Sequence, residues 1–251
     1  MDWTDDTSKK ALIAWDKLCS AGVTAGLNML DINMWNKAAI CKLLWTLSKK
    51  KDKLWRIFEA QKYFEQAGYD AEDVFRLRCF SIKGMYSKLR VVMPKVDWRK
   101  LVCNNEGAPK WIFILYVAIS RRLLTRTRLA KWGIVNEVKC PLCERMDEDV
   151  DPLLFGCPFS AAAWEKILQW QGSQRGSMAW QQEVQWATGN VIGRTDYAEI
   201  YRMALARSCV YHVWQERNWR IFQQRSRGTI EITRLIIQMG KGSKFTSKYG
   251  L

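Results

Sequence analysis

The chain has 251 residues, of which 48% are hydrophobic, so it can bury one or two ordinary cores and does not belong to the disordered class. Its net charge of +15 favours a polyanionic partner, most simply RNA or DNA. The longest apolar run, residues 111–119, is too short to span a bilayer, and no apolar leader follows Met1. We therefore expect no membrane association, reduced cysteines, and an intracellular location in the nucleus or cytoplasm.

Hydrophobic periodicity predicts a mainly α-helical fold with little sheet. In chain order, the segments expected to be helical are residues 33–48, 110–132, 161–171, 180–188 and 195–224. The first of them should begin at an Asn33 cap and bury an apolar stripe that includes Ile40 and Leu43. Gly133 is a typical stop for the second.

The helix expected over residues 110–132 changes character half-way, from apolar to basic. At helical spacing, Arg121, Arg128 and Lys131 share one face with Thr125. Such a row can neutralise successive phosphates without reading bases, although an ordinary solvated helix face has the same composition. The candidate nucleic-acid-binding residues are Arg121, Arg122, Arg126, Arg128 and Lys131.

A cysteine motif carries the most specific chemistry. Cys140 and Cys143 stand two residues apart, and Cys157 follows after a loop. This spacing is typical of a structural zinc site, which needs four ligands. In a Cys-x2-Cys…His-x4-Cys pattern the histidine would occupy position 152, where this chain has Pro152.

The sequence therefore leaves the identity of the fourth ligand undecided. His212, the only histidine, or Asp151 can substitute, or water can complete the coordination. A metal-free cluster of three small apolar thiols is the remaining alternative. We expect a degenerate site with weakened zinc affinity.

Catalytic motifs are lacking in the sequence. A polymerase needs paired aspartates that hold two metal ions, and no aromatic-x-Asp-Asp motif occurs. No glycine-rich phosphate loop occurs either, and the acidic residues between the cysteines are typical of a solvated loop. We therefore predict that the protein is not an enzyme and has no small-molecule substrate.

Several of these pieces also carry a family resemblance. The matching segments are residues 108–111, 122–126, 128–130, 140–143 and 153–158, together with Trp164. They resemble the zinc-binding domain of reverse transcriptases from plant LINE-type (non-LTR) retrotransposons. Where that family has Asp-His-Leu-Phe-Phe, this chain has Asp-Pro-Leu-Leu-Phe from Asp151.

The resemblance implies three parts. Residues 1–67 would be a helical remnant of the region that follows the polymerase core, with an internal deletion near positions 55/56. Residues 79–171 would form an irregular helical zinc-binding-like domain with a small Cys-knuckle loop. Residues 172–251 would be a helical C-terminal extension with a frayed tail.

The function implied is that of a non-catalytic C-terminal fragment of such a reverse transcriptase, binding RNA or DNA without sequence specificity. The alternatives are a metal-free helical protein–protein interaction domain and a retroelement relic without function.

Overall fold

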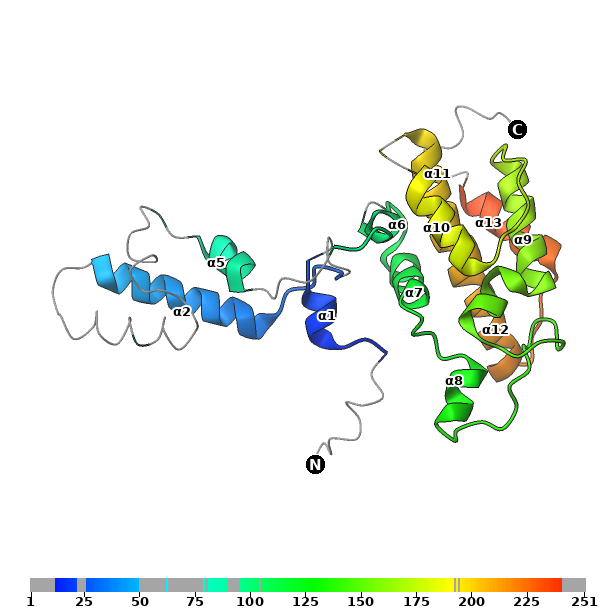
Figure 1. The fold of residues 1–251 in the computed structure, drawn as a ribbon, viewed down its shortest axis with the longest axis horizontal. Helices are drawn as coiled ribbons and strands as arrows, with labels where there is room; N and C mark the ends of the chain where they lie inside the picture. The colour runs from blue at the N-terminus through cyan, green and yellow to red at the C-terminus, as the bar shows by residue number, and fades with distance from the viewer. Residues whose placement is uncertain are drawn as a thin grey trace. The chain divides into compact units, whose positions relative to one another are not determined.

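The computed structural model describes residues 12–21, 26–49, 62, 79, 81–89, 95–103, 105–191, 193 and 195–240 (Figure 1). The expected deletion near 55/56 and the expected frayed tail lie outside these residues. The chain divides into two compact units, one of Ala14–Val96 and the other of Asp97–Leu251 with Met1–Ile13. The described residues contain helices and no strand, apart from an isolated antiparallel bridge between Lys139 and Asp147. The prediction of a mainly α fold is confirmed.

The unit Ala14–Val96 contains α1 (Trp15–Cys19), α2 (Ile32–Lys49) and α5 (Ile82–Leu89). Helix α2 packs against α5, and the rings of Trp35 and Tyr86 meet edge-on at 5.6 Å. The expected helix 33–48 is confirmed, but its cap is not Asn33. The Asp31 carboxylate accepts hydrogen bonds from the backbone N–H groups of Asn33 (2.9 Å) and Met34 (3.2 Å).

The buried face of α2 also differs from the predicted apolar stripe. Ile40 and Leu43 are 40% and 64% exposed, whereas Ala38 and Cys41 are fully buried. The prediction followed helical spacing, whereas the residues that the structure buries on α2 are the smaller Ala38 and Cys41. Helical spacing alone therefore misassigned the packed face.

The larger unit contains the remaining elements. They are α6 (Arg99–Cys103), α7 (Pro109–Ile119), α8 (Arg126–Lys131), η3 (Pro152–Gly156), α9 (Pro158–Trp170), α10 (Trp180–Asn190), α11 (Asp196–Ala204), η4 (Leu205–His212), α12 (Val213–Phe222) and α13 (Thr229–Gly240), where η marks a π-helical segment. The helices expected over 161–171, 180–188 and 195–224 are confirmed. Helix α13 was not predicted.

The single helix expected over 110–132 is wrong. Helix α7 ends at Ile119, Arg121 adopts a left-handed conformation (φ 55°), and α8 begins only at Arg126. A left-handed residue cannot continue an α-helix, so the chain changes direction at Arg121, and Leu123 in the connecting segment is buried. Arg121 therefore does not share a helix face with Arg128 and Lys131.

The core of this unit lies where α7 packs on η4 and where α9 packs on α13 and contacts η3. Figure 1 shows the helices α7, α9 and α13 of this unit. Aromatic rings fill its centre. Trp164 of α9 stacks on Phe155 (5.2 Å) and meets Tyr201 edge-on (5.7 Å), and Phe155 also contacts Trp180 (5.6 Å). None of the described helices combines the length and hydrophobicity that crossing a bilayer requires.

Trp164 has no solvent exposure, so replacing it should remove much of the core's packing. We expect Trp164→Ala to lower the free energy of unfolding by about 3–5 kcal/mol. Phe222→Ala is the matched control, because Phe222 is 75% exposed and should change stability by about 0.5 kcal/mol or less. Denaturant titration of both variants measures the difference, and equal losses of stability would contradict this core.

Candidate metal centre and nucleic-acid interface

The first two cysteines lie at the tip of a short hairpin. Its arms are joined by hydrogen bonds from the Glu148 N–H to the Val138 carbonyl (2.7 Å) and from the Cys140 N–H to the Met146 carbonyl (2.8 Å). The turn closes where the Glu144 N–H donates to the Cys140 carbonyl (2.8 Å), and Glu144 itself has a positive φ of 57°. We call residues 138–148 the knuckle hairpin.

The third cysteine, Cys157, is the residue immediately before α9. The chain reaches it through the η3 turn, in which Phe155 takes a φ of 108°, a conformation that L-residues rarely adopt. Ser160 holds this turn, because its hydroxyl accepts from the Phe155 N–H and donates to the Cys157 carbonyl (3.1 Å each). The turn thereby brings Cys157 back to the knuckle hairpin.

The three cysteines meet, as their spacing predicts. Their sulfur atoms all lie within 4.8 Å of one another, and the Sγ atoms of Cys140 and Cys157 are 4.0 Å apart. Cys140 and Cys157 are fully buried, while Cys143 is half-buried. Thiolates gathered in this way suit zinc, which prefers a tetrahedron of sulfur and nitrogen ligands.

The Cys140 thiol donates a hydrogen bond to the Cys157 sulfur (4.0 Å). Donation to Cys157, together with burial, raises the pKa of Cys140. The pKa of Cys157 is lowered, first by that thiol and also by the backbone N–H groups of Phe159 and Ser160. The N–H groups of Leu142 and Cys143 approach Cys140 in the same way. Both Cys-Pro turns thus direct amides at a sulfur atom, which favours the thiolate that a metal would bind.

No fourth ligand completes the cluster among the described residues. Pro152 begins η3 and has no donor atom in its side chain. The Asp151 carboxylate forms an ion pair with Arg121. His212 is buried, with its ring edge-on to Tyr211 at 5.3 Å, and is not a member of the group of close ligand atoms. Substitution by either residue remains a prediction.

The five basic residues proposed for nucleic-acid contact divide into two groups. Arg121 pairs with Asp151, and Arg126 donates to the Lys139 carbonyl (2.9 Å) and pairs with Glu137 (3.0 Å). Arg128 donates to the Arg121 carbonyl (3.2 Å) and lies over the Trp132 ring (5.2 Å). Burial, and then the nearby Arg122, lowers the pKa of Arg128.

The second group comprises Arg122 and Lys131. Both are exposed, and neither side chain makes a hydrogen bond or ion pair with the described part of the chain. Three of the five residues are therefore engaged in holding the fold, and two are available to a ligand.

A buried ion pair that the sequence did not reveal anchors the knuckle hairpin. Glu148 has no solvent exposure, and Arg217 of α12 is 3% exposed. The Arg217 Nε donates to Glu148 Oε1 (2.7 Å), while its Nη2 donates to Glu148 Oε2 (3.2 Å) and to the Leu124 carbonyl (3.1 Å). Helix α12 therefore fixes both the hairpin and the segment between α7 and α8.

Arg220, one turn further along α12, contacts the knuckle itself. Its Nη1 donates to the carbonyls of Pro141 (3.1 Å) and Leu142 (3.0 Å), and its guanidinium lies 4.7 Å from the Phe159 ring centre. Glu216 orients it through a 3.0 Å ion pair, a partner that the i,i+4 spacing could have indicated. No local pattern could have linked Glu148 to Arg217 across 69 residues.

Comparison with known families bears directly on this geometry. Residues 80–164 match the family model described as zinc-binding in reverse transcriptase. The chain contains a reverse-transcriptase-associated zinc-binding domain. The family comparison finds no polymerase domain. No curated protein and no solved structure matches the chain. The matched region ends at Trp164, so Arg217 and Arg220 lie beyond it.

The buried ion pair generates a stability prediction. Glu148→Ala leaves the Arg217 guanidinium buried without its counter-charge, so we expect the free energy of unfolding to fall by about 3–5 kcal/mol. Asp147→Ala is the matched control, because the neighbouring Asp147 pairs with Lys139 on the surface and should contribute at most about 1 kcal/mol. Similar losses of stability in the two variants, measured by denaturant titration, would show that Glu148 does not anchor the hairpin.

The missing ligand generates a metal prediction. Pro152→His restores the family pattern, so it should tighten zinc binding by at least about tenfold. Even the loss of a residue that only hydrogen-bonds to a metal ligand lowers metal affinity by about that factor. The zinc-dependent gain in thermal stability should rise with it. Competition with a calibrated chelator measures the affinity. Pro152→Ala, which removes the ring without adding a donor, should not tighten binding. Equal, tight, stoichiometric zinc binding in the original protein and Pro152→His would show that another residue already closes the site.

Proposed function

We propose that this protein is a non-catalytic nucleic-acid-binding module derived from the C-terminal part of a plant LINE-type (non-LTR) retrotransposon reverse transcriptase. The observation that carries the proposal is the pair of exposed cations, Arg122 and Lys131, within the residues that match a reverse-transcriptase zinc-binding domain. The net charge of +15 acts in the same direction, by attracting a polyanion.

The contact is made to the phosphate backbone. Arg122 and Lys131 provide the free charges, while Arg121, Arg126 and Arg128 add positive potential from fixed positions. Guanidinium and ammonium groups that meet phosphates position a strand without reading its sequence. Binding is therefore nonspecific and depends strongly on salt.

Zinc, if bound by Cys140, Cys143 and Cys157, has a structural role in this proposal. The knuckle hairpin is joined to α8, because the Glu148 carbonyl accepts from the Thr127 N–H (3.2 Å) and hydroxyl (2.8 Å). A metal that rigidifies the hairpin thereby helps fix the basic segment 121–131. The protein would perform no nucleotide chemistry itself, since its sequence lacks the paired aspartates of a polymerase.

One observation favours a protein–protein interaction domain as the second candidate. Helix α2 exposes the large apolar side chains of Ile32 (65%), Ile40 (40%) and Leu43 (64%). These residues recur at helical spacing on one side of α2, as in a helix that docks on a partner. In that case binding to nucleic acid would be absent, and the salt-dependence experiment separates the two.

We expect Arg122→Gln/Lys131→Gln to weaken binding of a single-stranded RNA oligonucleotide. The slope of log K against log salt should become shallower by about 0.7 for each phosphate contact that the substitutions remove. Fluorescence anisotropy at several salt concentrations measures both effects. Arg234→Gln, an exposed arginine on α13, is the control and should bind like the original protein. If the original protein shows no salt-dependent binding to RNA or DNA, the proposal fails.

A further inference from the structure

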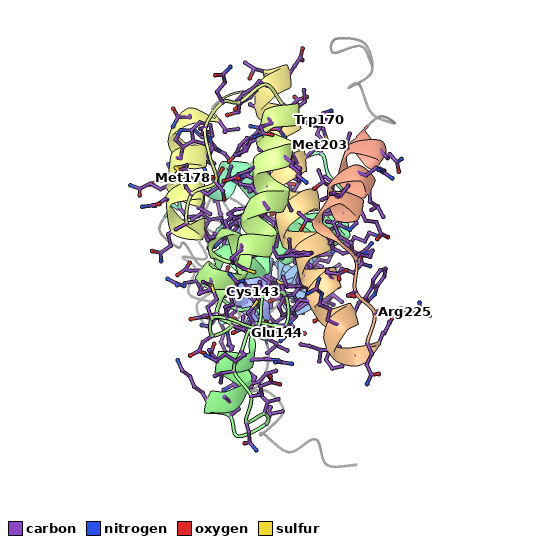
Figure 2. All side chains as sticks on the ribbon, turned by 90° about the vertical axis from the view of Figure 1, so that its right-hand side faces the viewer. Cys143, Glu144, Trp170, Met178, Met203 and Arg225 are labelled. Carbon is purple, nitrogen blue, oxygen red and sulfur yellow. The ribbon has the colours of Figure 1, made fainter. Side chains whose placement is uncertain are left out.

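A cavity of about 640 Å³ lies between the knuckle hairpin and the turn that follows α12. One wall comes from α8 and the hairpin, and the other comes from the end of α12 and the residues after it. The charged residues that line it are Arg126, Lys139, Arg220, Arg225, Glu137 and Glu144. Figure 2 shows Arg225 on the outer side of the turn after α12, at the same level of the unit as Cys143 and Glu144.

The turn that supplies the second wall is sharply defined. Helix α12 ends at Phe222, and Gln224 adopts a left-handed conformation (φ 53°) that reverses the chain. Glu216 holds the segment that follows this turn, because its buried carboxylate accepts hydrogen bonds from the backbone N–H (2.7 Å) and the Nε (3.0 Å) of Arg227. The position of Arg225 is thus fixed at the backbone while its side chain stays exposed.

The four cations differ in how many donors they have left. Arg220 uses its Nε on Glu216, its Nη1 on two knuckle carbonyls and its Nη2 on the Arg227 carbonyl, so one of its five N–H groups remains. Lys139 makes one bond, to Asp147 (2.9 Å). The Arg225 side chain makes no hydrogen bond or ion pair with any described residue.

Of the two carboxylates in the lining, Glu137 is already paired with Arg126 (3.0 Å), which leaves Glu144 as the opposing charge. The lining therefore keeps a positive balance. Arg225 is unpaired among the described residues, and Lys139, although it pairs with Asp147 (2.9 Å), has two further ammonium N–H groups that can meet an anion. Because Arg220 is held in place by protein contacts, it would lose little freedom on binding.

The lining also indicates the type of anion. None of the described residues around the cavity is aromatic, so it offers no platform on which a base or nucleoside can stack. Its donors are guanidinium, ammonium, amide and hydroxyl groups, which suit phosphate oxygens. A cavity that is partly open to solvent and lined in this way fits a nucleic-acid strand at the surface better than an enclosed small molecule.

We infer that this cavity is a second contact site for the phosphodiester backbone of a nucleic acid, with Lys139 and Arg225 as its principal ligands. The inference rests on the proposed function and extends it. The C-terminal extension, which lies outside the matched zinc-binding domain, supplies one of the two walls of the site, including Arg225. A bound strand would contact Arg122 and Lys131 as well as the cavity.

The test compares Lys139→Gln/Arg225→Gln, Arg225→Gln alone and the control Arg234→Gln in the full chain. The probes are single-stranded RNA and DNA oligonucleotides of the same sequence, followed by fluorescence anisotropy at several salt concentrations. The double variant should bind about tenfold more weakly, with a slope of log K against log salt that is shallower by about 0.7 for each phosphate that no longer meets a cation. The single variant should show roughly half of that slope change.

The outcomes separate this inference from the proposed function. If Arg122→Gln/Lys131→Gln weakens binding and Lys139→Gln/Arg225→Gln does not, the cavity is not a contact site and the proposed function stands. If the original protein binds neither probe, both fail. Equal weakening with RNA and DNA supports a backbone contact, whereas weakening confined to RNA would overturn it. Arg225→Gln keeps the test decisive if the double variant fails to fold, since the Arg225 side chain bonds to no described residue.

Discussion

The arrangement of the site depends on one buried carboxylate. Glu148 ends the knuckle hairpin, accepts two hydrogen bonds from Arg217 of α12, and lies 3.3 Å from the backbone nitrogen of Arg126 at the start of α8. Three segments far apart in the sequence therefore meet at a single group. The free energy needed to desolvate such a pair offsets much of its electrostatic attraction. A buried charge left without its partner, however, is far more destabilising. The pair thus acts mainly by excluding arrangements in which the hairpin and α12 are apart.

This constraint defines a structural unit larger than the matched domain. The family match stops at Trp164, yet Arg217 and Arg220 of α12 hold the hairpin and the carbonyls of its tip. The same contacts determine which cations reach solvent. Arg121 and Arg126 are held by carboxylates near the cysteines, so the free positive charge lies at Arg122 and Lys131, and at Arg225 beyond the match.

Features that depend on residues close together in the sequence could be predicted from sequence patterns. The spacing of Cys140, Cys143 and Cys157 was sufficient to predict their cluster, because two Cys-Pro turns direct their own amides at the sulfur atoms. Most helices followed from periodicity. The break at Arg121 did not, since the left-handed conformation of Arg121 and the burial of Leu123 leave no mark in the hydrophobic pattern. The packed face of α2 was missed because burial selected Ala38 and Cys41 over larger neighbours, and the partner of Glu148 lies 69 residues away.

The same contacts give a physical account of how Pro152 is compatible with this fold. In small zinc domains the metal supplies much of the folding energy, so losing a ligand threatens the whole structure. Here Arg220 holds the carbonyls of Pro141 and Leu142, Glu148 anchors the base of the hairpin, and Ser160 fixes the turn that returns Cys157. The cysteines are therefore brought together by protein contacts as well as by any ion. Because protein contacts also hold the cysteines, a missing ligand lowers the zinc affinity of the site more than it changes the arrangement of the three cysteines.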